Sequence, residues 1–199
     1  MKVAITGSSG LAKNIKDTLE ASPHQGDTIK VSTPRIEDIT MNDVRWWGFD
    51  YDNSNHVDVL INFAHKDFDQ TRILDIAHRA WKSDDSKFII NISSRAAQPN
   101  ISKGYMYSAS KAALSQLSNN LKFKEDKKCR ITDINPGLLE SDLPSMEYKE
   151  LAQWVVYLMN KEAHVEVGEI SLWHRASYVD VQKQKQIKLN ESRKNMGQD

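Results

Sequence analysis

Two nearly continuous apolar runs, each closed by a polar turn, constrain the fold of this chain more than any other feature. Residues 57–63 read Val-Asp-Val-Leu-Ile-Asn-Phe, and residues 88–92 read Phe-Ile-Ile-Asn-Ile. Such runs predict strands that are covered on both faces, which is typical of parallel sheets. Between them, residues 69–82 carry apolar side chains at helical spacing, as a crossover helix does. We therefore expect an α/β fold.

The same pattern continues along the chain. Strands are predicted at 2–6, 28–33, 57–62, 88–92, 130–134 and 169–173, with a further short strand within 41–51, and helices at 13–21, 69–82, 105–122 and 148–159. This alternation predicts a doubly wound parallel sheet in a single Rossmann-type three-layer α/β/α domain. We place that dinucleotide-binding and catalytic domain at residues 1–174. Residues 175–199 are polar and rich in lysine, and we interpret them as a C-terminal tail.

Composition narrows the classes of partner. Lysine and arginine together number 27, as do aspartate and glutamate, so the net charge is zero. This balance gives no reason to expect nucleic acid or an anionic membrane as a partner. The single cysteine, Cys129, cannot form an intramolecular disulfide, and no apolar N-terminal segment resembles a signal peptide. A cytoplasmic location is expected.

Candidate catalytic residues follow the strand at 88–92. Ser94 comes just after it, and Tyr107 lies thirteen residues later, with Lys111 four residues beyond. On a helix, Tyr107 and Lys111 share one face. The serine hydroxyl can hydrogen-bond a carbonyl oxygen, the tyrosine can pass a proton, and a nearby ammonium favours the tyrosinate. This set suits interconversion of a carbonyl and an alcohol.

The tyrosine–lysine spacing alone is weak evidence, because it recurs at Tyr157 and Lys161. Thirteen residues before Tyr157 stands Pro144, which cannot play the part of a serine. That second pair is better interpreted as part of a core helix.

The turn at Gly7–Ala12 lies between the first predicted strand and the first helix. Glycines let the backbone approach a pyrophosphate, and a helix N-terminus offers free amide donors. Two other strand ends carry polar or small residues, Asn62-Phe63-Ala64-His65 and Asn135-Pro136-Gly137. Ligands bind at the carboxyl ends of parallel strands, so these turns are expected to border a nucleotide.

In this order, the glycine turn, residues 58–64, Ile92-Ser93-Ser94, residues 107–111 and Asn135-Pro136-Gly137 resemble the short-chain dehydrogenase/reductase family, of which this chain would be an unusually short member. The resemblance covers residues 1 to about 173. It implies that Tyr107 is the catalytic acid and base and that Ser94 polarises the carbonyl. It also implies that Lys111 binds the nicotinamide ribose and that Ser141 hydrogen-bonds the cofactor.

The chain departs from the family pattern in several places. The glycine turn is one residue shorter, and Ala12 stands where a third glycine is usual. The family's helical asparagine has no clear counterpart, although Asp67 or Gln70 falls near its place. His65 replaces the glycine that usually ends its turn. A lone histidine is more often structural, but a titratable role near the nicotinamide stays open.

The end of the second strand bears on the choice of cofactor. Residues 32–35 read Ser-Thr-Pro-Arg and offer no carboxylate for the adenosine ribose of NAD. Arg35 can bind a 2′-phosphate bidentately, so NADP(H) is favoured and NAD(H) stays possible. Glu37 or Asp38 could pair with Arg35 and weaken that preference. Residues and resemblance together assign cofactor binding to Gly7, Ser8, Ser9, Gly10, Leu11, Ala12, Thr33, Arg35, Asn62, Phe63, Ala64, Tyr107, Lys111, Pro136, Gly137, Leu139 and Ser141.

The sequence therefore predicts an NADP(H)-dependent oxidoreductase that interconverts a small-molecule carbonyl and an alcohol by hydride transfer. A catalytically weak NADP(H)-binding sensor on the same fold is the alternative. A Rossmann-type methyltransferase is a weaker third reading, because it leaves the serine, tyrosine and lysine unexplained. No metal is predicted. The resemblance implies a homodimer or homotetramer through the helices at 69–82 and 105–122.

Overall fold

A computed structural model describes residues 1–8, 10–21, 29–33, 57–98, 104–141, 144–162, 164–176, 183–188 and 190–191. Its strands are β1 (Lys2–Ile5), β2 (Lys30–Ser32), β3 (Val59–Asn62), β4 (Phe88–Ile92), β5 (Arg130–Pro136) and β6 (Glu169–Leu172). Its helices are α1 (Leu11–Ala21), α3 (Asp69–Trp81), α4 (Tyr105–Lys122), α5 (Tyr148–Met159) and the short 3₁₀ helix η2 (Arg95–Ala97). None of the helices in these ranges is both long and apolar enough to cross a membrane.

The six strands form one parallel sheet in the order β2-β1-β3-β4-β5-β6. From β1 the chain first moves outward to β2 and then returns to the other side of β1 as β3, so the winding reverses between β1 and β3. In open α/β sheets, ligands bind outside the carboxyl ends of the strands at such a reversal. The predicted doubly wound Rossmann-type fold is confirmed.

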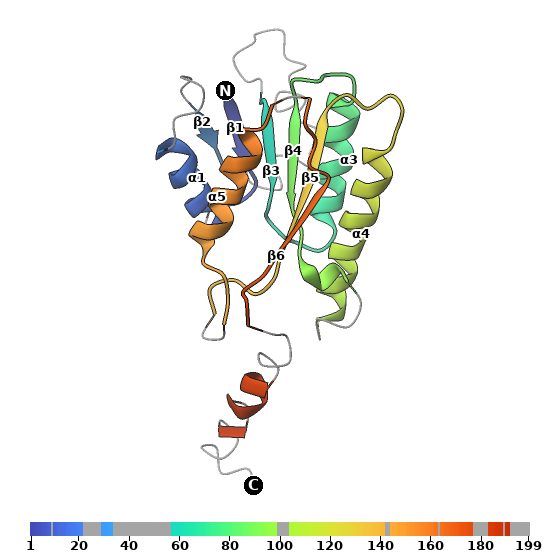
Figure 1. Ribbon diagram of the computed structural model, residues 1–199. Coiled ribbons are helices and arrows are strands. Elements are labelled where there is room, and N and C mark those ends of the chain that lie inside the picture. Colours follow the sequence, from blue (N-terminus) through green and yellow to red (C-terminus); the bar gives the residue numbers. More distant parts are fainter. Residues whose placement is uncertain are drawn as a thin grey trace.

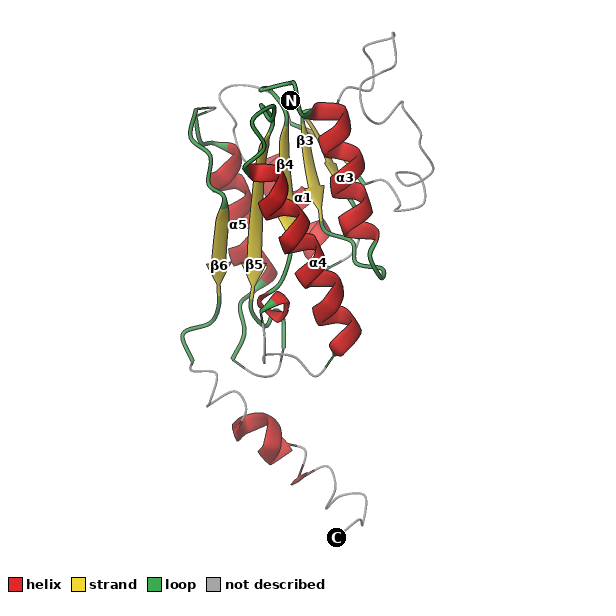
Figure 2. Ribbon diagram, turned by 90° about the vertical axis from the view of Figure 1, so that its right-hand side faces the viewer, coloured by secondary structure: helices red, strands yellow, loops and turns green. Residues whose placement is uncertain are grey.

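Side-chain alternation along the strands builds two cores, one on each face of the sheet. In β4, Ile90 packs with α1 and α5, whereas its neighbour Ile89 packs with α3 and α4. Figure 1 shows α1 and α5 on one face and α3 and α4 on the other, and Figure 2 shows α3 and α4 in front of the strands. Cys129 is buried in the second core, where burial raises the pKa of its thiol to about 11, so it behaves as a small apolar residue.

A row of polar side chains crosses the sheet on the α3 and α4 face. Asn62, Asn91 and Asp133 are aligned on adjacent strands. The amide of Asn62 donates to Asn91 Oδ1 at 3.0 Å, and the amide of Asn91 donates to Asp133 Oδ1 at 2.8 Å. Lys122 of α4 closes the row with an ion pair to Asp133 Oδ2 at 2.7 Å. These contacts tie three adjacent strands to α4.

The predicted ranges agree closely with the observed elements. The strand at 88–92 and the helices at 105–122 and 148–159 have the predicted bounds. The strand predicted at 130–134 extends to Pro136, because Asn135 and Pro136 still pair with β6. The short strand predicted within 41–51 lies outside the described residues.

Candidate active site

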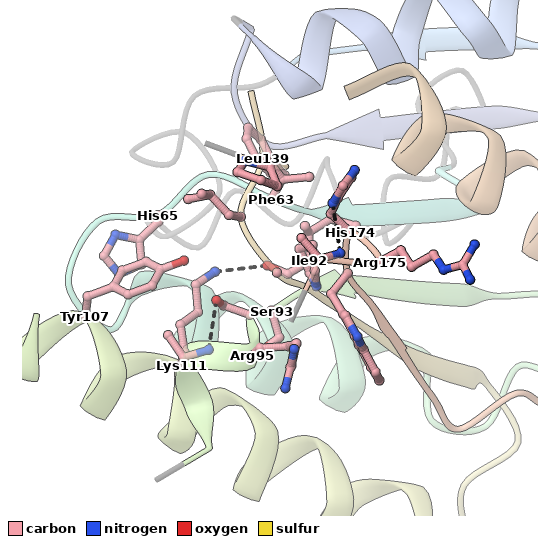
Figure 3. A pocket seen from close by; sticks show the side chains of 18 of the residues that line it. Phe63, His65, Ile92, Ser93, Arg95, Tyr107, Lys111, Leu139, His174 and Arg175 are labelled. Atoms are coloured by element: carbon pink, nitrogen blue, oxygen red, sulfur yellow. Dashed lines mark hydrogen bonds between the residues drawn. The ribbon is translucent and has the colours of Figure 1, made fainter. Parts of the chain in front are cut away.

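A cavity of about 600 Å³ opens at the carboxyl ends of β3, β4 and β5 (Figure 3). The predicted catalytic residues Ser94, Tyr107 and Lys111 all line it. They come from two elements, since Ser94 follows β4 and the other two lie on α4. The tertiary structure thus brings the predicted catalytic set to one cavity.

Ser94 is placed by the end of its strand. The residue is extended, with φ −165° and ψ 150°, and it begins η2 by accepting a hydrogen bond from the Ala96 amide at 3.1 Å. That contact uses a lone pair of Oγ and leaves the hydroxyl hydrogen for another acceptor. Ser94 can therefore donate to a carbonyl oxygen in the cavity.

Tyr107 lies in the first turn of α4, and 37% of it is exposed. Its ring meets the edge of the His65 ring at a centroid distance of 4.8 Å. His65 Nε2 lies 2.9 Å from Ser110 Oγ, and that hydroxyl donates to the Tyr107 carbonyl at 2.8 Å. Because the single hydroxyl hydrogen of Ser110 is used there, His65 Nε2 acts as the donor. Burial, assisted by the Lys111 charge, lowers the pKa of His65.

Lys111 is only 3% exposed and is held by two acceptors. Its Nζ donates to Gln70 Oε1 at 2.6 Å and to the Ile92 carbonyl at 2.9 Å, and it lies 5.6 Å from the centre of the Tyr107 ring. Burial lowers the pKa of Lys111 to about 7. Its ammonium therefore loses its proton close to neutral pH, where it faces the tyrosine ring.

Gln70 is the residue beside Lys111 that sequence reasoning left undecided. Its Oε1 accepts from Lys111, while its Nε2 donates to the Asn62 carbonyl at 2.8 Å and the Ile92 carbonyl at 3.2 Å. The alternative, Asp67, acts through its charge on His65 instead. Helical spacing indicates that Gln70 is buried. It stands three residues before Ile73 and four before Leu74, which are both buried, so it shares their face of α3.

The buried position of Lys111 gives a testable dependence of stability on pH. Its pKa is about 7 when folded, against about 10.4 in an unfolded chain, so between these values only the unfolded state holds the proton. The contribution of Lys111 to stability must then rise with pH, by at most about 1.4 kcal/mol per pH unit. Urea unfolding from pH 6 to about 8.5, below the range in which the thiol of Cys129 ionises in the unfolded chain, should show this rise in the wild type and a smaller one in Lys111→Met. The exposed Lys149→Met is the control, and identical pH profiles for wild type and Lys111→Met would refute the assignment.

The glycine turn fits an anionic group. Gly7 and Gly10 have positive φ values of 95° and 53°. The positive φ of Gly7 favours glycine, and a Cβ there would lie 3.3 Å from the Cβ of Ala64, a tight contact just after the end of β3. The first turn of α1 contains no acidic residue that would compete for its amides. The glycine turn would therefore bind an anionic group through backbone amides, at the point where the winding of the sheet reverses.

The remaining predicted cofactor residues fall into several groups. Phe63, Pro136, Gly137 and Leu139 line the cavity beside Tyr107 and Lys111. Asn62, Leu11 and Ala12 are buried in the interior. Because the side chains of Leu11 and Ala12 are apolar, these two residues can offer only backbone atoms to a cofactor. Ser141 and Thr33 lie outside the cavity lining, Ser8 is exposed, and Ser9 and Arg35 lie outside the described residues.

Comparison with known proteins gives the class of the fold. Residues 71–152 match the model of the short chain dehydrogenase family. Serine dehydrogenase from Escherichia coli is 18% identical with a TM-score of 0.70, covering 87% of this chain and 97% of its own. The alcohol dehydrogenase from Thermococcus sibiricus, complexed with 5-hydroxy-NADP, is 16% identical with a TM-score of 0.64, covering 89% and 98%. A search of curated protein sequences found no match.

The 3-alpha-hydroxysteroid dehydrogenase from Pseudomonas sp. B-0831, complexed with NADH, adds a third structure at 15% identity and a TM-score of 0.66, covering 86% of this chain and 95% of its own. The resemblance to the short-chain dehydrogenase/reductase family is thereby confirmed. The sequence resembles the family over residues 71–152, and the fold resembles that of family members over most of the chain. The described groups of histidine, cysteine, aspartate and glutamate include none that could hold a metal ion.

Proposed function

We propose that this protein is an NADP(H)-dependent oxidoreductase that interconverts a carbonyl and an alcohol. One observation carries the proposal: a single cavity at the carboxyl edge of the sheet is lined by Ser94, Tyr107 and Lys111. A hydroxyl donor, a phenol and a buried amine together form a site that can hold a carbonyl oxygen and move a proton to it.

Each residue has a distinct role in the reduction. The Ser94 hydroxyl and the Tyr107 phenol donate hydrogen bonds to the carbonyl oxygen, where negative charge develops. When bound, NADPH supplies the hydride that forms the new C–H bond at the carbonyl carbon. The proton of Tyr107 Oη passes to the oxygen, and Lys111 in its protonated form stabilises the tyrosinate that results by its charge. Oxidation of an alcohol uses the same groups in reverse.

Gln70 fixes the geometry of this relay. By accepting from Lys111 Nζ and donating to the ends of β3 and β4, its amide holds the amine under Tyr107. Gln70 is therefore a positioning residue in this proposal, at the place near which the family carries an asparagine. The proposal explains why a buried amide is needed at the N-terminal end of α3.

The choice of NADP(H) rests on Arg35 together with the likeness to cofactor complexes. A closed form of serine dehydrogenase contains NADP⁺, and a metagenomic short-chain oxidoreductase contains NADP. The Pseudomonas complex with NADH keeps NAD(H) open. Assembly through the outward faces of α3 and α4 and a cytoplasmic location stay predictions.

Titration with NADPH and NADH, followed by nicotinamide fluorescence, tests the cofactor assignment. We expect tighter binding of NADPH. Gly7→Ala should weaken binding by about tenfold or more, because the added Cβ pushes the turn away from Ala64 and misplaces its backbone amides, and a loss of about 1.4 kcal/mol of binding free energy equals a factor of ten. The control is Gly168→Ala, where a Cβ would meet only a lysine side-chain carbon at 4.0 Å. Binding of neither nucleotide by the folded wild type would refute the oxidoreductase. Binding with no turnover on a carbonyl panel would favour the sensor.

A further inference from the structure

The cavity is strongly asymmetric in charge. Its described lining includes Arg95, Lys111, Arg175 and Lys185, and none of the lining residues that the structure describes is aspartate or glutamate. The chain as a whole has equal numbers of basic and acidic residues, so this excess is local. A concave site lined by one sign of charge concentrates ligands of the opposite sign.

Arg95 is the cation best placed to touch a substrate. It follows Ser94 directly, so its Cα lies about 3.8 Å from that of the carbonyl-binding serine. Its guanidinium stacks 4.3 Å from the centre of the Trp173 ring, which stands just after β6. Stacking uses the face of the guanidinium and leaves the N–H edges free to donate. Among the described residues, none forms an ion pair with Arg95.

The neighbouring polar groups support this reading. Figure 3 shows Tyr107 and His65 on one side of the cavity and His174 and Arg175 on the other. His174 Nδ1 accepts from the Ala176 amide at 3.1 Å, so its other nitrogen is the one that can donate. The carboxylate of Glu140 is occupied by the Tyr148 amide at 2.7 Å. Glu140 does not line the cavity, and none of the described carboxylates forms an ion pair with Arg95.

We propose that the substrate is a small oxo acid, or the matching hydroxy acid, whose carboxylate is bound by Arg95 while Ser94 and Tyr107 hold the carbonyl. This inference rests on the proposed function and names the substrate class for that site. The planar fork of arginine matches a carboxylate with two parallel hydrogen bonds. Because Ser94 and Arg95 are adjacent, the carboxylate lies within a few bonds of the reacting carbon.

Turnover of matched substrates tests the assignment. With NADPH present, kcat/KM is measured for 2-, 3- and 4-oxo acids and for their methyl esters, which keep the carbonyl but lose the charge. A charge-assisted contact is expected to favour the best acid over its ester by about 10- to 100-fold. Arg95→Gln should remove that preference while leaving the esters nearly unchanged. Arg79→Gln, which removes an exposed arginine of α3 paired with Asp75, is the matched control and should change neither.

A binding measurement separates this inference from the proposed function. Oxamate, an inert anion with the shape of an oxo acid, and its neutral counterpart oxamide are titrated into the protein–NADPH complex by calorimetry. Tighter binding of oxamate that is lost in Arg95→Gln supports the inference even where turnover fails. Esters reduced as well as acids, together with equal binding of oxamate and oxamide, would overturn it and leave the oxidoreductase intact. Equal losses on acid and ester in a folded Arg95→Gln would also overturn it.

Discussion

Replacing Tyr107 with phenylalanine is expected to lower turnover by about 10²- to 10⁴-fold, the usual contribution of a positioned proton donor. The substitution removes one hydroxyl and keeps the ring, so the edge contact with His65 at 4.8 Å and the α4 backbone persist. The loss should therefore appear in kcat, measured by NADPH absorbance. The nucleotide dissociation constant from fluorescence should change little.

A matched control lies on the same helix. Tyr105 stands two residues before Tyr107, is 83% exposed, and does not line the cavity. Tyr105→Phe removes the same atom from α4 and should leave both kcat and nucleotide binding unchanged. Turnover by Tyr107→Phe at the wild-type rate would exclude the proposed acid and base role.

Replacing Lys122 with methionine is expected to destabilise the fold by about 3–5 kcal/mol, as breaking one side of a buried ion pair does. Asp133 is 1% exposed and also accepts from Asn91 and Ser118, so its carboxylate would remain buried without its cation. Urea denaturation at pH 7 would measure the loss. A change below about 1 kcal/mol would show that Asp133 does not depend on this lysine.

The double variant Lys122→Met with Asp133→Asn tests whether the unpaired charge of Asp133 causes the loss of stability. An asparagine keeps an acceptor for Asn91 or Ser118 but carries no charge, so much of the lost stability should return. Lys13→Met is the control, because Lys13 and Asp17 form an exposed pair on α1, and such pairs contribute at most about 1 kcal/mol.

Local pattern was enough to locate most of the secondary structure. The helix at Tyr105–Lys122 and the strand at Phe88–Ile92 follow from apolar spacing within single segments, and both have the predicted bounds. The Tyr107 and Lys111 pair could likewise be placed on one helical face from their separation of four residues. These features depend on residues close in sequence, which periodicity describes directly.

Contacts between distant segments could not be read in this way. Gln70 meets Lys111 across 41 residues, and both reach the Ile92 carbonyl at the end of β4. The sequence offered Asp67 or Gln70 near the place of the family's asparagine, and packing of α3 against α4 brought Gln70 to Lys111. Helical spacing says which face a residue occupies but not which element lies against that face.

By itself the sequence determined the alternating strands and helices, the glycine turn and the serine, tyrosine and lysine of the cavity, because each is set by short-range spacing. Only the tertiary structure decided that Gln70 holds Lys111, that His65 lies against Tyr107 and that Arg95 stacks on Trp173 beside Ser94. Those contacts exist because the parallel sheet brings the carboxyl ends of β3, β4, β5 and β6 to one edge. The order of strands within that sheet is fixed by packing between segments far apart in the chain.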